Sequence, residues 1–124
     1  LEAYHYRGIV RYGMKDLDGA LADYNKAISL GLKSSAVYFN RGVIFHQKGQ
    51  LSDAIESYSR SIEIDPSNAR AYYNRAISKL IVDNYKEALQ NDLVTRKRQK
   101  LSRNIINFQS PRSCITFFNR SCVV

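Results

Sequence analysis

The sequence predicts an all-α fold, a right-handed superhelical stack of antiparallel helix pairs. Three observations indicate it. The 124-residue chain repeats itself every 34 residues. Within each period, apolar residues recur at the spacings of three and four that are typical of an amphipathic helix. Glycine or proline separates most of the helical segments. A fixed period is what stacked helical hairpins require, because every unit must present the same face to the next.

The period is carried by small and aromatic residues at fixed places. The matching sets are Tyr4, Arg7, Gly8, Leu17, Ala20 and Tyr24, then Tyr38, Arg41, Gly42, Leu51, Ala54 and Tyr58, then Tyr72, Arg75, Ala76, Tyr85 and Ala88. We expect the small residues where the two helices of a hairpin approach closely. The tyrosine of the second helix is expected to fill the adjoining space.

The helical segments follow from this pattern and from the residues that end them. Helices are predicted over 1–14, 18–30, 35–48 and 52–64, and a third pair begins near Asn68, breaks at Asp83-Asn84 and resumes at Tyr85. Gly31 is expected to end the second helix, and Asp65-Pro66 the fourth, because proline cannot extend a helix.

The third repeat departs from the pattern in its second half. Asp92 stands where the earlier repeats have Tyr24 and Tyr58, and arginines replace the aliphatic residues that follow. Either this segment is a capping helix whose outer face meets water, or the chain has left the repeat register. We expect helix to about Arg103 and irregular structure after it. The predicted divisions are repeats over 1–34 and 35–68, a partial repeat over 69–95, and a basic, poorly ordered tail over 96–124.

The repeated motifs resemble those of the tetratricopeptide repeat family over roughly residues 1 to 92. They are Tyr4-x-x-Arg7-Gly8, Tyr38-x-Asn40-Arg41-Gly42, Tyr72-x-Asn74-Arg75-Ala76, Ala54-x-x-x-Tyr58 and Asp65-Pro66. The resemblance is specific as to fold and says little about the ligand. The chain opens inside a repeat and without Met, so we interpret it as a three-repeat fragment of a longer array, with an imperfect third repeat.

The first helices of such hairpins line the inner, concave surface of the stack. On a helical wheel, the arc opposite the packing residues faces this groove. The predicted peptide-binding residues on that arc are Tyr6, Ile9, Phe39, Asn40, Val43, Arg70, Tyr73, Asn74 and Ile77. This mixture of aromatic, aliphatic and amide groups suits a bound peptide. The predicted function is therefore a protein–protein interaction scaffold, with a protein or peptide as partner.

Asn40 and Asn74 occupy the same repeat position, and arrays of this family use an asparagine row to hold a peptide main chain. The alternative is an asparagine that bonds within its own hairpin. Chaperone-binding members hold a C-terminal carboxylate with a Lys, Asn and Arg cluster. Only Asn40 and Arg70 fit that pattern here, so a carboxylate clamp is not expected.

Arginines at 7, 41 and 75 also form a row, which suggests either an anion site or packed stems with satisfied head groups. Their place beside the packing face favours the packed stems. Two histidines, far from the two cysteines, give no metal-ligand spacing. No nucleophile elbow, phosphate loop or carboxylate pair is present. We therefore expect no enzyme activity, metal, cofactor or small-molecule substrate.

Charge is concentrated at the end of the chain. From Arg96 onward there are seven basic and no acidic residues, which leaves 12 basic against 11 acidic residues before it. The alternative functions are nucleic-acid or acidic-membrane contact through Arg96, Lys97, Arg98 and Lys100, or a purely structural segment of a longer array. No secretory signal or membrane span is visible, so a cytoplasmic location is expected, with a nuclear one possible.

Overall fold

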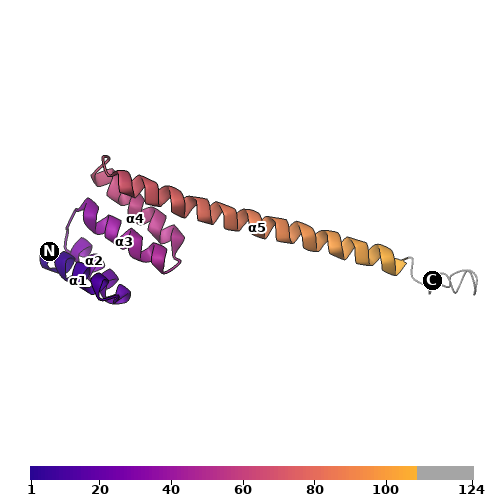
Figure 1. The fold of residues 1–124 in the computed structure, drawn as a ribbon, viewed down its shortest axis with the longest axis horizontal. Helices are drawn as coiled ribbons and strands as arrows, with labels where there is room; N and C mark the ends of the chain where they lie inside the picture. Colours follow the sequence, from indigo (N-terminus) through magenta and orange to yellow (C-terminus); the bar gives the residue numbers. More distant parts are fainter. Residues whose placement is uncertain (109–124) are drawn as a thin grey trace, which may run out of the picture. The chain divides into compact units, whose positions relative to one another are not determined.

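The computed structural model describes residues 1–108, and every regular element in that part of the chain is a helix (Figure 1). The helices are α1 (Glu2–Gly13), α2 (Leu17–Ser29), α3 (Ser35–Gln47), α4 (Leu51–Ile64) and α5 (Ala69–Phe108). The all-α prediction is confirmed, and α1 to α4 lie within a residue or two of their predicted bounds. Residues Leu1–Asp83 form one compact unit, and a second begins at Asn84.

The first unit is built from two helix pairs and the first turns of α5. In Figure 1, α1 packs beside α2 and α3 beside α4, and α2 also contacts α3. The predicted stack of hairpins is therefore present for the first two repeats. Its core has two clusters, one of Ala20, Tyr24, Val37 and Ile44 and one of Phe39, Ala54, Tyr58 and Ala71. Each cluster contains one of the repeated alanines and one of the repeated tyrosines.

Each hairpin closes on a glycine–tyrosine contact. A Cβ atom at Gly8 would lie 2.6 Å from Cε1 of Tyr24, and one at Gly42 would lie 2.6 Å from Cε1 of Tyr58. Both tyrosines are about 1% exposed. Only a residue without a side chain leaves room for the ring, so glycine and tyrosine recur together in the sequence.

The repeated arginines are held by the helices around them. Each guanidinium lies over the tyrosine three residues earlier, at 5.0–5.5 Å from the ring centre. The polar contacts are Arg7 Nη2 to Asp23 Oδ1 at 2.7 Å, Arg41 Nε to Ser57 Oγ at 3.1 Å and Arg75 Nη1 to Ser59 Oγ at 3.1 Å. These contacts support packed stems with satisfied head groups and leave no reason to propose an anion-binding row.

The third hairpin differs from the prediction. The expected break at Asp83-Asn84 is absent, and α5 continues through both residues to Phe108. Neither residue is a glycine or proline, whereas Gly49 stands in the turn of the second hairpin, so nothing local stops the helix. The expected irregular structure directly after Arg103 is also wrong, since 104–108 are helical. The rest of the predicted tail, with Cys114 and Cys122, lies outside the described residues.

Candidate functional site

A hollow of about 490 Å³ lies where α3, α4 and α5 begin or end. It is lined by Ser34, Ser35, Ala36, Phe39, Asn40, Asp65, Asn68 and Arg70. Three of the nine predicted groove residues, Phe39, Asn40 and Arg70, therefore meet at one place. They come from the first helices of two successive repeats, which is where the stack was expected to form a binding surface.

Arg70 is the cation that lines this hollow. Its guanidinium carbon lies 5.2 Å from the centre of the Phe39 ring, and its side chain is exposed. No ion pair of Arg70 is found within residues 1–108. A guanidinium held over an aromatic ring keeps its donors in a defined plane, which suits a carboxylate ligand. The pKa of Asp65, which also lines the hollow, is lowered by hydrogen bonds from the Ser67 hydroxyl and backbone N–H, so this carboxylate is held in its charged form with its Oδ1 already hydrogen-bonded.

Asn40 and Asn74 each lie beside the core tyrosine of the preceding hairpin. Burial raises the pKa of the Tyr24 hydroxyl, and hydrogen bonding with Asn40 opposes that rise. Burial raises the pKa of Tyr58 in the same way, with Asn74 as the opposing group. The alternative of an asparagine bonded within its own hairpin therefore does not describe these contacts. An amide has up to four hydrogen-bonding places, so both retain capacity for a peptide main chain.

The other predicted groove residues lie outside this hollow. Tyr6 and Tyr73 are 61% and 68% exposed, and Ile9 is exposed to a lesser degree. Val43, Asn74 and Ile77 are half-buried. Phe39 differs most from its predicted role, because it is only 9% exposed and its ring lies 5.8 Å from that of Tyr58. It is a core residue with one edge in the hollow.

The sequence patterns did not predict the network of polar side chains beside this hollow. The hydroxyls of Ser35 and Ser61 lie 2.7 Å apart, and each donates to the other residue's carbonyl oxygen. Asn68 Nδ2 donates to both hydroxyls, and its Oδ1 accepts from the Ala71 N–H at 3.2 Å. Asn68 thus caps α5 and fixes the hollow's edge. Its place one period after Ser34, the cap position of α3, was the available signal.

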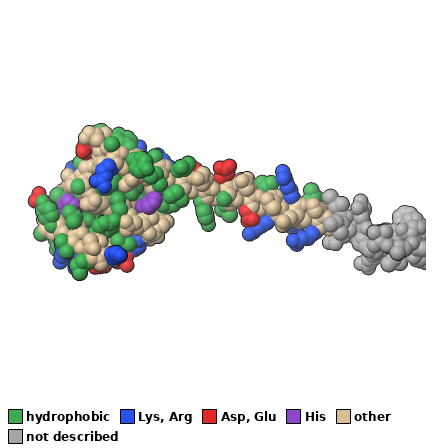
Figure 2. Space-filling model, in the orientation of Figure 1, with side chains coloured by type: hydrophobic (Ala, Val, Ile, Leu, Met, Phe, Trp, Pro, Cys, Tyr) green, Lys and Arg blue, Asp and Glu red, His purple; other side chains and the backbone are tan. Residues whose placement is uncertain are grey.

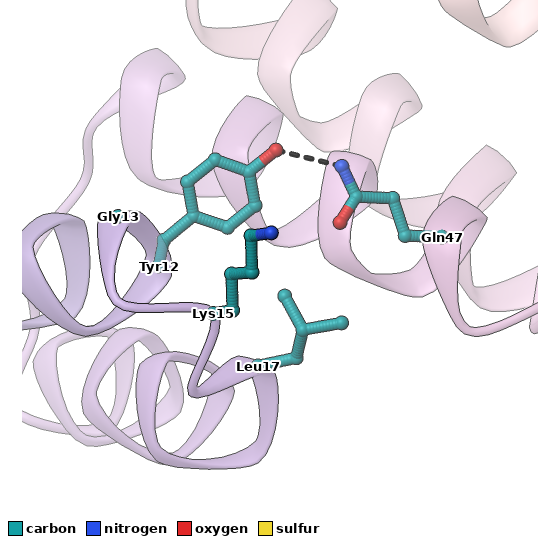
Figure 3. Close-up of a pocket in the computed structure, with 5 residues that line it drawn as sticks. All are labelled: Tyr12, Gly13, Lys15, Leu17 and Gln47. Atoms are coloured by element: carbon teal, nitrogen blue, oxygen red, sulfur yellow. Dashed lines mark hydrogen bonds between the residues drawn. The ribbon is translucent and has the colours of Figure 1, made fainter.

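A second hollow of about 420 Å³ lies at the turn between α1 and α2 (Figure 3). It is lined by Tyr12, Gly13, Lys15, Leu17 and Gln47. Gln47 Nε2 donates to the Tyr12 hydroxyl at 2.7 Å, which joins the end of α1 to the end of α3. Both residues lie on the wheel arc that faces the groove. Here they connect neighbouring repeats.

Metal and membrane sites are not found in the part of the chain that the structure describes. No group of three His, Cys, Asp or Glu side chains is placed to hold a metal ion there. No helix among residues 1–108 is long and apolar enough to cross a bilayer. His46 Nδ1 lies 3.0 Å from the Ser78 hydroxyl, and burial lowers the pKa of His5. Both histidines are therefore engaged in packing.

Comparisons with known proteins agree with this geometry. Residues 42–79 match a family described as TPR repeat. The Arabidopsis OM64 TPR domain is 28% identical, with 70% of this chain and 72% of that one covered and a TM-score of 0.63. The TPR2B domain of yeast Sti1, solved in complex with pHsp70, is 26% identical, with 72% and 71% covered and a TM-score of 0.62.

A third similar structure is that of MamA, at 25% identity and a TM-score of 0.62. That match covers 77% of this chain and 60% of MamA, so the chain spans less than two thirds of that protein. Among curated proteins, no sequence matches the chain significantly.

Proposed function

We propose that this chain, whose residues 42–79 match the TPR repeat family and whose fold is similar to that of TPR domains, binds a peptide segment of a partner protein in its groove. The hollow at Phe39, Asn40 and Arg70 is the observation that carries the proposal. It combines an aromatic edge, an amide and a cation within one concave surface. Those are the groups that hold an extended peptide by its main chain and one acidic group.

The charge and exposure of the lining decide which peptides fit best. Arg70 is a cation without an ion-pair partner in the described residues, so an acidic side chain or a terminal carboxylate is the preferred contact. Tyr73, next along α5, is 68% exposed and offers a large apolar surface for a neighbouring side chain. A peptide with one carboxylate close to one large apolar residue matches both groups.

The Sti1 structure supports the class of partner. It is a TPR domain of similar fold, and it was solved together with pHsp70. That complex shows that a protein with this arrangement of helices holds a protein ligand. By analogy, the ligand proposed for this chain is a segment of a protein, and the peptide selection described next is designed to identify it.

The test is selection of binders from a displayed library of random peptides. The variant Arg70→Glu with Tyr73→Ser removes the cation and the exposed ring, and both side chains are exposed, so the fold is retained. We expect the natural chain to enrich peptides that carry an acidic residue, and the variant to lose at least about tenfold in affinity for them. Phe39 is left unchanged because its burial makes it a poor probe of binding.

The matched control is Lys26→Glu with Leu30→Ser, which makes the same kinds of change on exposed residues in and directly after α2. It should bind the selected peptides like the natural chain. Equal binding by the groove variant would refute the groove as the site, and so would the absence of any enriched peptide.

A further inference from the structure

Lys15 occupies a turn position at which the fold favours glycine. Its φ is 64°, in the left-handed region, and Gly49 stands one period later with φ of 77°. A residue with a side chain is less stable in this conformation than glycine, so the lysine stands there against the preference of the backbone. Its side chain is exposed and forms no ion pair within residues 1–108. These observations indicate that the lysine serves something other than folding.

The Lys15 side chain extends into the hollow of about 420 Å³ at the turn between α1 and α2 (Figure 3). We call this the turn hollow, and its lining is Tyr12, Gly13, Lys15, Leu17 and Gln47. The Tyr12 hydroxyl accepts a hydrogen bond from Gln47 Nε2 at 2.7 Å, so its own proton is available to a ligand. The lining thus offers a cation, a hydroxyl donor and an apolar wall at Leu17, and it contains no carboxylate.

The carboxylates nearest to Lys15 in the sequence are engaged elsewhere. Asp16 Oδ1 accepts from the Gly19 N–H at 3.0 Å and caps α2. Asp18 pairs with Lys48. Neutralisation of the Lys15 ammonium group is therefore left to a ligand. A carboxylate suits a cation that stands beside a hydroxyl donor, because it accepts hydrogen bonds from both.

The turn hollow lies on the same face of α3 as the hollow proposed above to bind a peptide, which we call the groove hollow. Ala36, Asn40, Val43 and Gln47 follow one another at spacings of four, three and four residues, which places them on one side of the helix. The first two line the groove hollow, and the last lines the turn hollow. Both hollows belong to the compact unit Leu1–Asp83.

The surface between the two hollows is suited to an acidic peptide. His5 and His46 fall on the wheel arc that faces the groove, so Figure 2, in which both histidines are visible, shows this face. Hydrophobic side chains lie across it, and acidic ones appear only at its margin. From Phe39 to Gln47, α3 advances about 12 Å. An extended peptide advances about 3.3 Å per residue, so it covers this distance, with some offset across the helix, in about four to six residues.

We propose that the turn hollow binds an acidic side chain of the same peptide, about four to six residues from the acidic group that contacts Arg70. This inference rests on the function proposed above, and it specifies the ligand as a peptide with two acidic residues at that spacing. Tyr12 and Lys15 contact the second carboxylate, and Leu17 packs against its methylene groups. The lysine then contributes to binding, which explains its place in a backbone conformation that favours glycine.

The first test repeats the selection from the displayed library of random peptides on three chains. We expect the natural chain to enrich peptides with two acidic residues at the stated spacing. Lys15→Gln keeps the side-chain length and removes the charge. It should enrich peptides with a single acidic residue, and it should bind the paired peptides about three- to tenfold more weakly. Lys26→Gln is the matched control, because this exposed lysine of α2 lines neither hollow.

The outcomes separate this inference from the function on which it rests. Peptide binding that depends on Arg70 but is equal in the natural chain and in Lys15→Gln would overturn the inference and leave the groove function standing. Loss of the paired preference in Lys26→Gln as well would assign the effect to overall charge, and this too would overturn it. Enrichment of no peptide at all would remove both.

The second test separates binding from folding. Lys15→Gly should raise the urea midpoint of unfolding, because glycine suits the left-handed turn, and should also weaken binding of the paired peptides about three- to tenfold. A residue with only a structural role would not weaken binding while its replacement stabilises the fold. Lys15→Arg keeps the cation and should retain the paired preference. Unchanged affinity in Lys15→Gly would show that Lys15 does not contact the peptide.

Discussion

At the scale of single residues, close packing between a glycine and a tyrosine joins the two helices of each of the first two hairpins. Gly42→Ala should lower the free energy of unfolding by about 1–3 kcal/mol, because the added methyl overlaps the Tyr58 ring edge. Gly13→Ala is the control, since nothing lies within 4 Å of a Cβ there. It should be neutral or slightly stabilising. Urea unfolding of both variants measures the difference, and equal stability would contradict the assigned contact.

Asp23 gives stability a dependence on acid pH. It is 2% exposed, and the hydrogen bond from Arg7 lowers its pKa below the ordinary 3.8, with Arg11 adding to the effect. A lowered pKa favours the charged form in the folded chain, so this stabilisation is present above about pH 4 and is lost as the pH falls further. Asp23→Asn should therefore cost about 1–2 kcal/mol at pH 7, a value reduced because Arg7 is half exposed.

The comparison for Asp23 is Asp18→Asn, which alters an exposed ion pair with Lys48 and should cost less than about 0.5 kcal/mol. Urea unfolding between pH 7 and pH 3 measures both variants. The gap between the natural chain and Asp23→Asn should narrow below about pH 4. A gap that stays constant with pH would mean that Arg7 does not stabilise the charged carboxylate.

The sequence predicted the packing of residues that recur in each repeat. It predicted less well the role of residues that lie between the core and the groove. Gly42, Ala54 and Tyr58 pack as the period predicted, since the first repeat has the same residue types at the same positions, Gly8, Ala20 and Tyr24. Phe39 was assigned to the groove by its angle on the helical wheel, and it both lines the hollow and packs in the core at 9% exposed. A wheel gives direction only, and it does not show that the Tyr58 ring extends beneath this position.

At the scale of elements, the turns inside the two hairpins use the same left-handed conformation with different residues. Gly49 has φ of 77°, and Lys15, one period earlier, has φ of 64°. Glycine adopts this conformation freely, whereas for other residues its conformational free energy is higher by about 1–2 kcal/mol. Lys15→Gly should therefore raise the free energy of unfolding by about 0.5–1 kcal/mol.

The reciprocal change, Gly49→Ala, should lower stability by about 1–2 kcal/mol. No atom lies within 4 Å of a Cβ at Gly49, so backbone conformation alone is responsible. Thermal or urea unfolding of the two variants provides the comparison. A Lys15→Gly variant that is less stable than the natural chain would contradict this prediction. It would mean that contacts of the Lys15 side chain stabilise the fold by more than its left-handed backbone conformation costs.

The ends of the helices that stop at a glycine or a proline were predictable from the sequence. The length of α5, which has no such residue at Asp83-Asn84, was not. Gly31 and Pro66 follow the ends of α2 and α4 closely. At Asp83-Asn84 the turn was expected only by analogy with the earlier repeats. Asp92 also replaces the tyrosine that anchors the second helix of each complete hairpin. With neither a breaker nor an anchor, the local preference for helix continues through α5.

At the scale of the whole molecule, binding at the proposed groove and binding at the basic segment of α5 should depend differently on salt concentration. Arg96, Lys97, Arg98 and Lys100 are all exposed on α5. Contact with nucleic acid through such residues falls steeply as salt rises, because each phosphate contact releases counterions. A peptide held by one carboxylate, one ring and an amide has a shallow salt dependence by comparison.

Neutralising the basic segment therefore tests which surface captures a partner. In the full chain, Lys97, Arg98 and Lys100 are changed to Gln, and Arg96 is kept because it pairs with Asp92. Affinity for the peptides selected by the groove should change by less than about twofold, both in this variant and between 50 and 200 mM salt. Any binding of a single-stranded oligonucleotide should fall at least about tenfold in the variant. Titration calorimetry measures both ligands, and loss of peptide binding in the variant would place the partner on the basic segment instead of the groove.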